Sequence, residues 1–407
     1  MRVMTVPAGP TSVSECLARE FFAAVHDHEP VCGWTHNFYR YPARFSPRFA
    51  RAAIQCFSRP GDLVLDPYMG GGTTVVEALA GGRRVVGNDL NPLAVFVARV
   101  KTTELAKNEV DAVARWAQEI VPMLSYRGHC GGLGEYVRDP RTKNLGLSRS
   151  RFIKKVAGQA LASFEPLPTD AARAFARCAL LRVAQWALDG RKGHTSLGQF
   201  RSKLLATTNQ MLSALRDYTV YVAAHNRFQR ITNLLSQLDA TQIDTLPVFQ
   251  PGGEKASLVV TSPPYPGVHV LYHRWQVDGR RETPAPYWIA ACQDGQGASF
   301  YNFGGREEEG LHRYFESSLR TLMAIRHVLQ PGAIAVQLVA FGDPHTQLPR
   351  YLGNMELAGF TEVFPFGRRR DGHAKRLWRH VPGRKWHAAI HGSTNSSREV
   401  VLVHRTQ

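Results

Sequence analysis

The sequence predicts an α/β fold in which a parallel β-sheet is flanked by helices and interrupted by a mostly helical insertion. Residues 63–100 indicate a strand, a glycine turn, a helix, a strand and a second helix, the pattern of a βαβ unit. From 103 to 235, apolar residues recur at helical spacing instead. The α/β pattern returns after Leu258, so two separate stretches of chain are expected to build one sheet.

Prolines and glycines delimit the first elements. A polar lead-in contains one short helix near Val13 to His26, and a further helix is expected from Pro47 to Phe57. Leu63 to Leu65 then predicts the first strand, and Thr73 to Ala80 the helix that follows it. Arg84 to Gly87 predicts the second strand, after which Pro92 begins a helix at a favoured first-turn position.

The insertion and the second half of the core complete the organisation. Insertion helices are expected at Val110 to Leu124, Ala171 to Leu188 and Phe200 to Ala224. Residues 315–343 indicate a helix, a Pro-Gly turn and a strand, and residues 398–405 a final strand. The expected division is a lead-in (1–36), a core (37–102 and 236–407) and a helical insertion (103–235).

The charge balance points to a polyanionic partner. The 407-residue chain holds 50 Lys and Arg against 33 Asp and Glu, a formal net charge of +17. A chain this basic usually meets nucleic acid, although a basic surface can also serve solubility alone. Hydrophobic residues make up 44%, which is enough for a sizeable core.

Cysteine and histidine usage favours a metal-free protein of the cytoplasm. None of the six cysteines forms a Cys-x-x-Cys pair, which argues against a zinc site or a redox couple. His26 and His28 lack a partner at ligand spacing, so we expect no metal. No apolar run is long enough to span a bilayer, and the N-terminus shows no signal-peptide core.

Three interpretations compete for the glycine-rich stretch DPYMGGGTT, residues 66–74. A P-loop requires a lysine that is absent after Gly72, and a dinucleotide fingerprint requires a glycine where the chain has Val75. The third is a site for S-adenosylmethionine, where the ligand lies against bare backbone and the helix from Thr73 directs its positive end toward a carboxylate. An ordinary tight turn between strand and helix is the structural alternative.

Asp89 supports a nucleoside ligand. It falls at the end of the second predicted strand, 23 positions after Asp66, where an acid can accept both ribose hydroxyls. Asp89 or Asn91 could instead cap the following helix. Both roles are compatible if Asn91 caps and Asp89 binds.

The stretch TSPPY, residues 261–265, ends an apolar strand with two prolines, which cannot donate to a sheet. Together with DPYMGGGTT, it resembles the amino-methyltransferases of DNA, which make N4-methylcytosine or N6-methyladenine from S-adenosylmethionine. Their signatures are a (D/N/S)-P-P-(Y/F/W) tetrapeptide and an F-x-G-x-G loop, in which Tyr68 here replaces phenylalanine. YPARF, residues 41–45, resembles a third family element that covers the methionine end of the cofactor.

The resemblance covers residues 37–100 and 236–405 and leaves the insertion unexplained. It implies a Rossmann-like class I methyltransferase core that binds S-adenosylmethionine. Asp239, with Asp244 second, stands where the family has an acid that touches the adenine amino group, although either could cap a turn. The expected cofactor-binding residues are Tyr41, Pro42, Ala43, Asp66, Tyr68, Gly70, Gly72, Thr73, Thr74, Asp89, Asn91 and Asp239.

The expected catalytic residues are Ser262, Pro263, Pro264 and Tyr265. An exocyclic amine is a weak nucleophile because its lone pair is delocalised into the ring. The Ser262 hydroxyl and the Pro263 carbonyl can accept its two N–H bonds, while the prolines hold these acceptors rigidly. Tyr265 offers a face on which a flipped base can stack. A rigid Pro-Pro turn alone would explain the strand end but not the flanking serine and tyrosine.

Serine at the first tetrapeptide position favours cytosine N4 within this family. Adenine N6 is the alternative, and RNA is a less favoured substrate than DNA. C5-methylation requires a cysteine nucleophile, usually after a proline, and none of the six cysteines follows one. A protein of another class, which binds nucleic acid without catalysis, would keep the same fold. The enzyme would serve in a restriction-modification or other defence system beside a nuclease, or alone.

Basic segments are candidates for nucleic-acid contact, with a solvated loop as the alternative. Residues 366–386 carry eight Arg or Lys against Asp371, with two tryptophans interleaved. The insertion lies where some family members carry their target-recognition region. The expected contacts are Arg280, Arg281, Arg368, Arg369, Arg370, Lys375, Arg376, Trp378, Arg379, Arg384 and Lys385.

Overall fold

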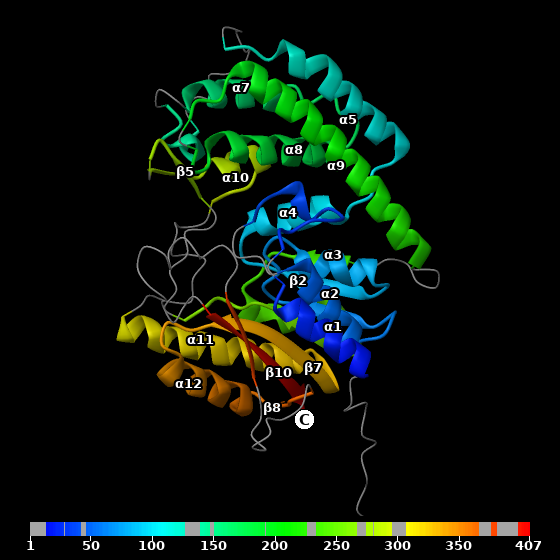
Figure 1. Ribbon diagram of the computed structural model, residues 1–407, viewed down its shortest axis with the longest axis vertical. Helices are drawn as coiled ribbons and strands as arrows, with labels where there is room; N and C mark the ends of the chain where they lie inside the picture. The colour runs from blue at the N-terminus through cyan, green and yellow to red at the C-terminus, as the bar shows by residue number, and fades with distance from the viewer. Residues whose placement is uncertain are drawn as a thin grey trace, which may run out of the picture.

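The molecule is built around one twisted β-sheet, seen near edge-on in Figure 1. Its strand order is β3-β2-β1-β4-β7-β10-β8, with β9 paired to β10. The computed structural model describes residues 14–27, 29–41, 46–126, 139–146, 150–191, 193–225, 233–266, 274–279, 281–294, 307–365, 376–380 and 398–407.

The strands from β3 to β7 are all parallel, whereas β10 runs antiparallel to β7, β8 and β9. This order, with its one antiparallel strand, confirms the expected Rossmann-like α/β fold. The strands are β1 (Leu63–Asp66), β2 (Arg84–Asn88), β3 (Asn233–Ser236), β4 (Ala256–Thr261), β7 (Leu329–Ala340), β8 (Phe360–Glu362), β9 (Leu377–His380) and β10 (Arg398–Thr406).

Helices cover both faces of the sheet, because alternate side chains of its strands point to opposite sides. Val64 and Leu258 pack with the first group of helices, and Leu65 and Val259 with the second. The first group is α1 (Glu15–Val25), α2 (Pro47–Phe57), α3 (Thr73–Ala80) and α4 (Pro92–Thr102). The second group is α11 (Glu308–His327) and α12 (Pro344–Leu357), with the 3₁₀ helices η4 (Ala240–Thr245) and η5 (Pro247–Phe249).

Local signals set the helix boundaries near the glycine loop. The Ser46 side chain accepts from the backbone N–H of Arg48, and Pro47 opens α2. The Asn91 side chain caps α4 in the same way, again before a proline. The expected bounds of α2 and α3 are confirmed.

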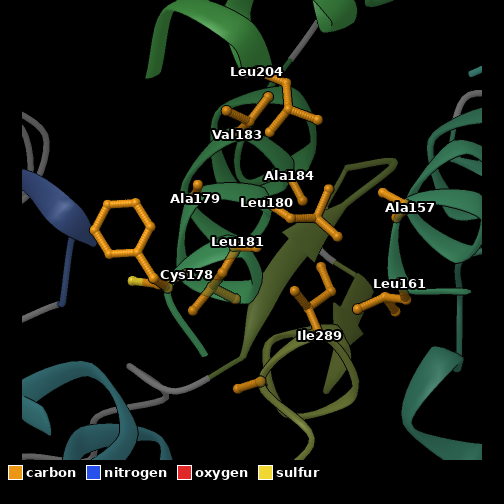
Figure 2. Close-up of a cluster of buried hydrophobic side chains, with 14 of the residues drawn as sticks. Ala157, Leu161, Cys178, Ala179, Leu180, Leu181, Val183, Ala184, Leu204 and Ile289 are labelled. Atoms are coloured by element: carbon orange, nitrogen blue, oxygen red, sulfur yellow. The ribbon is translucent and has the colours of Figure 1, made fainter. Parts of the chain in front are cut away.

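The insertion forms a helical layer whose apolar core extends onto α4. Figure 2 shows Leu180 and Leu181 of α8 among Leu161 of α7, Leu204 of α9 and Ile289 of α10. The layer therefore includes residues from after the TSPPY stretch, which the predicted domain division assigned to the core. Its elements are α5 (Lys107–Ile120), η2 (Val121–Met123), η3 (Pro140–Thr142), α7 (Arg151–Ala162), α8 (Asp170–Leu188), α9 (Leu197–His225), β5 (Trp275–Val277), β6 (Arg281–Thr283) and α10 (Ala285–Ala290).

Two features join the helical layer to the core. Helix α9 runs from the layer down to α3 (Figure 1), where the Tyr218 hydroxyl donates to the Val76 carbonyl at 3.1 Å. The short helix η1 (His36–Phe38) lies beside α8, and Phe38 packs edge-on against Phe175. Within the described residues, no helix combines the length and the apolar character needed to cross a membrane.

The chain re-enters the sheet earlier than the predicted boundary at residue 236. Asn233–Ser236 forms β3, which pairs in parallel with β2. The expected Pro-Gly turn also lies inside a strand. Pro331 and Gly332 form an irregularity within β7, because Leu329 pairs with Ala256 whereas Ile334 pairs with Leu258.

Candidate functional site

The glycine loop and the TSPPY loop meet at the carboxyl edge of the sheet. The first follows β1 and the second follows β4, and these strands are parallel neighbours. Strand order reverses between them, since β2 and β3 lie on one side and β7 on the other. In open α/β sheets, ligands bind at this reversal, beyond the carboxyl ends of the strands.

Two side-chain hydrogen bonds tie these loops together. The Thr261 hydroxyl donates to Oδ1 of Asp66 at 2.6 Å, and the Thr74 hydroxyl donates to the Val260 carbonyl at 3.0 Å. Burial raises the pKa of Asp66 to about 7, although the hydrogen bonds from Thr261, Thr74 and the Tyr68 amide oppose the shift. Asp66 and Thr74 are buried, so they hold the scaffold rather than line the site, which corrects their expected direct role.

The glycine loop is shaped by close packing against other parts of the chain. A Cβ on Gly71 would lie 2.7 Å from Cβ of Tyr41, and one on Gly72 would lie 2.9 Å from Cβ of Ala98. Gly70 and Gly72 also have φ of 49° and 76°, which favour glycine. The glycines are therefore required by the fold itself, whatever ligand the loop also admits.

Asp89 links β2 to the glycine loop. Its Oδ2 accepts from the Gly70 amide and its Oδ1 from the Asn91 amide, both at 2.8 Å. Burial raises the pKa of Asp89 to about 6, against the effect of these two hydrogen bonds. Asp89 as a residue is only partly buried, and each carboxylate oxygen keeps lone-pair capacity for a further donor.

Asn91 has the capping role that sequence reasoning offered as an alternative. Its Oδ1 accepts from the Leu93 amide at 2.9 Å and from the Tyr287 hydroxyl of α10 at 3.1 Å. Its Nδ2 donates to the Tyr41 hydroxyl at 3.1 Å. Asn91 is buried, so it supports Tyr41, which covers the glycine loop, and joins the loop to the helical layer.

The remaining expected cofactor residues are less central. Tyr68 is anchored by a hydrogen bond to Thr321 of α11, and Thr73 is buried at the start of α3. Asp239 follows β3 at the same edge and caps η4 by accepting from the amide and hydroxyl of Thr241, at 2.9 and 2.8 Å. The capping alternative thus describes Asp239. Pro42 and Ala43 lie outside the described residues.

A hydrogen-bond chain holds the TSPPY loop. Oγ of Ser262 lies 3.0 Å from the Tyr265 hydroxyl and 3.1 Å from the Leu338 carbonyl of β7. The Tyr265 hydroxyl donates to Glu399 of β10 at 2.6 Å, and Tyr314 of α11 donates to the Pro264 carbonyl at 2.9 Å. Burial raises the pKa of Tyr265 well above its ordinary value, and Glu399 adds to the effect.

The expected nucleic-acid contacts divide sharply. The expected contact of Arg379 with nucleic acid is contradicted, because its side chain is 1% exposed and its Nε donates to Glu399 at 2.7 Å. Arg376 makes a two-pronged contact with Glu362, at 2.6 and 2.7 Å. Trp378 is partly buried beneath the Arg398 guanidinium, and Arg281 is exposed on β6. The other candidates lie outside the described residues, namely Arg280, Arg368, Arg369, Arg370, Lys375, Arg384 and Lys385.

Sequence reasoning missed three residues that support the site. Glu399 precedes four apolar strand residues, Val400 to Val403, and that contrast was the available signal. Lys101 is buried on the last turn of α4, and its Nζ donates to the Gly71 carbonyl at 2.6 Å. Tyr314 gave no local signal, because its contact with Pro264 depends on how α11 packs.

One family model matches part of this region. Residues 21–98 match the model described as DNA methylase, from α1 into α4, and include the glycine loop and Asp89. By this match, the segment is similar to the DNA methylase family. The expected resemblance to the DNA amino-methyltransferases is confirmed there, and with it S-adenosylmethionine as the cofactor of the family.

Three curated relatives share short stretches with the chain. It is 35% identical over 79 residues to the Type II methyltransferase M.MvaI of Kocuria varians, and 32% identical over 66 residues to M.MjaII of Methanocaldococcus jannaschii. It is 38% identical over 61 residues to the putative methylase YubD of Escherichia coli. These stretches represent 19%, 16% and 15% of this chain, and 17%, 12% and 27% of the relatives.

Solved structures superpose only loosely. The rRNA methyltransferase aviRa from Streptomyces viridochromogenes gives a TM-score of 0.34 at 12% identity, covering 92% of this chain and 90% of that one. TrmN from Thermus thermophilus gives 0.32 at 13% identity, covering 89% and 49%. The strand order and pairing of the chain itself define its fold.

Proposed function

We propose that the protein transfers a methyl group from S-adenosylmethionine to the exocyclic N4 amine of cytosine in DNA. The observation that carries the proposal is the meeting of two loops. The glycine loop of a DNA methylase segment and the Ser-Pro-Pro-Tyr loop follow adjacent parallel strands, and two side-chain hydrogen bonds join them.

The residues at this edge fit the cofactor. The carboxylate of Asp89, one strand from the glycine loop, has acceptor capacity suited to a pair of ribose hydroxyls. Tyr41 covers the loop where the methionine end would lie. When bound, S-adenosylmethionine supplies an electrophilic methyl group.

The protein's own contribution is to orient the amine. The Ser262 hydroxyl and the Pro263 carbonyl accept N–H bonds, which concentrates the nitrogen lone pair and directs it toward the methyl group. The Tyr265 ring is fixed at its hydroxyl end by Glu399, so it presents a stationary face to a flipped base. Ser262 is a weak base, so the proton leaves after methyl transfer.

Ser262, at the first position of the tetrapeptide, favours cytosine N4 over adenine N6 as the atom that is methylated. The exposed Arg281 and the basic segment of residues 366–386 supply candidate DNA contacts. The helical layer, whose α10 touches Asn91, is in position to combine target recognition with the catalytic edge. A restriction-modification or other defence role, with a partner nuclease, belongs to the same proposal.

Nucleoside mass spectrometry of DNA from cells expressing the protein tests this function, with Ser262→Ala as the control. N4-methyldeoxycytidine that depends on Ser262 is the expected result. Detection of N6-methyldeoxyadenosine instead would leave the proposed site unchanged and show that adenine is the substrate base. If neither base is methylated while the purified protein binds S-adenosylmethionine, the DNA methylation proposal fails, and RNA or a binding protein without catalysis becomes the better description.

A further inference from the structure

We propose that Glu399 fixes the direction of the hydrogen bonds around Ser262, so that the serine hydroxyl meets the substrate amine as an acceptor. Glu399 is then a positioning residue, acting through Tyr265 rather than touching the substrate. This inference rests on the proposed methyl transfer. It concerns residues on β9 and β10, far in sequence from the motif that they would control.

The geometry is a continuous chain of four side chains from three parts of the sheet. Arg379 of β9 donates from Nε to Oε2 of Glu399 at 2.7 Å. The Tyr265 hydroxyl donates to the other oxygen, Oε1, at 2.6 Å. Ser262 completes the chain at 3.0 Å from Tyr265, and its Oγ also lies 3.1 Å from the Leu338 carbonyl.

Burial makes this chain more than a surface contact. The side chains of Arg379 and Glu399 are 1% and 6% exposed, and the guanidinium lies over the Phe49 ring at 5.8 Å. An ion pair removed from water is held in one geometry, because breaking it leaves a buried charge without its partner. The carboxylate is therefore a fixed acceptor beneath the catalytic loop.

Counting protons gives the direction of each bond. Ser262 and Tyr265 together carry two hydroxyl hydrogens, whereas three acceptor contacts compete for them. The ionised carboxylate is the strongest acceptor, so it takes the tyrosine hydrogen. The Tyr265 oxygen can then only accept from Ser262, and the serine hydrogen goes to Tyr265 or to Leu338.

Both arrangements leave the Ser262 lone pairs for an incoming N–H. A free serine hydroxyl could rotate and donate to the amine nitrogen, which would occupy the lone pair that must attack the methyl group. Glu399 removes that option, because the serine hydrogen is directed inward. The buried pair thus supports the acceptor chemistry that the reaction requires.

Replacing Glu399 by glutamine should reverse the direction of the hydrogen bonds that link residue 399, Tyr265 and Ser262. Arg379 is a charged donor and would take the amide oxygen, which turns the amide NH₂ toward Tyr265. The tyrosine would then accept from the amide and donate its own hydrogen to Ser262, filling a serine lone pair. Tyr265→Phe keeps the stacking ring but removes the hydroxyl that transmits this change, so Glu399→Gln should have little further effect on kcat in that background.

The experiment compares the wild type, E399Q, Y265F and E399Q/Y265F in steady-state methylation of DNA at saturating S-adenosylmethionine. We expect E399Q to lower kcat about tenfold with little change in KM for DNA, the size of one misdirected hydrogen bond. We expect E399Q to cause no further loss of kcat once Tyr265 is already phenylalanine. E362Q is the control, because Glu362 of β8 forms a two-pronged but more exposed pair with Arg376, the residue before β9. The kcat of E362Q should stay within about twofold of wild type.

The decisive readout is whether the two losses combine, since a purely structural Glu399 predicts that E399Q lowers kcat further in the Y265F background. That result, or an E399Q enzyme with wild-type kcat, overturns the inference while leaving methyl transfer standing. If E399Q does not fold, E399L/R379M replaces the buried pair by apolar side chains, and its effect on kcat is compared with and without Y265F in the same way. A wild type without methylation of DNA refutes the proposed function, and this inference with it.

Discussion

The two loops that meet at the carboxyl edge of β1 and β4 are built in opposite ways. The glycine loop depends on residues that have no side chain, because Tyr41 and Ala98 occupy the space that a Cβ would need. The Ser262–Tyr265 loop depends on side chains that are present, and residues of three other elements hold it. The first is thus specified locally, whereas the second is specified by distant parts of the chain.

The largest expected effect comes from filling the first loop. Gly72→Ala introduces a Cβ 2.9 Å from Ala98 at a φ of 76°, so the free energy of unfolding should fall by about 2–4 kcal/mol. Urea denaturation measures this change. Gly198→Ala is the control, since its Cβ would meet nothing within 4 Å in the first turn of α9, and it should be neutral or slightly stabilising. Equal losses from both substitutions would contradict the packing argument.

Removing a side chain from the second loop should separate activity from stability. Ser262→Ala deletes one acceptor for the amine, and kcat for methylation should fall about 10- to 100-fold. The free energy of unfolding should change by only about 1 kcal/mol, because the lost bond to Leu338 lies on a partly exposed loop. Kinetics with DNA and a melt of the same preparation check the two numbers. A large loss of stability with unchanged kcat would reverse the assignment.

The carboxyl group between the loops should make stability depend on pH. The pKa of Asp66 is about 7 in the folded protein, against about 4 in an unfolded chain. Since the folded pKa is the higher one, the stabilisation by Asp66 is complete below about pH 4 and is lost as pH rises through about 7. Asp66→Asn should therefore flatten this fall in the free energy of unfolding, followed by urea denaturation across that range. Parallel pH profiles for both proteins would count against it.

The smallest expected effect concerns the bond between the loops. Thr74→Val keeps the shape of the side chain but removes the donor to the Val260 carbonyl, which should cost about 1 kcal/mol of unfolding free energy. Thr241→Val is a useful comparison, because the Thr241 hydroxyl bonds the exposed Asp239 and should matter less. Thermal melts of both variants rank the two bonds. The reverse ranking would show that the loops are not held by this contact.

Features that are specified locally could be predicted from the sequence, whereas contacts between distant residues could not. The stretch from β1 to α4 was predictable, because prolines, glycines and apolar runs fix each of its boundaries within a few residues. Arg379 was misjudged because a run of basic residues indicates a solvated surface, and nothing nearby reveals that Glu399 pairs with it across two strands. β3 was missed because four residues after a long helical region give little periodicity.

The path of the chain also has a consequence for how such a protein could change its preferences over evolutionary time. The long insertion departs after α4 and returns at β3, so it interrupts none of the hydrogen-bonded strand pairs of the sheet. The helical layer nevertheless holds α10 and the β5–β6 hairpin, which come from beyond the Ser262–Tyr265 loop. A transfer of the helical layer between relatives would therefore have to include both the insertion and the segment from β5 to α10. A phylogeny based on either stretch alone would describe only part of the layer.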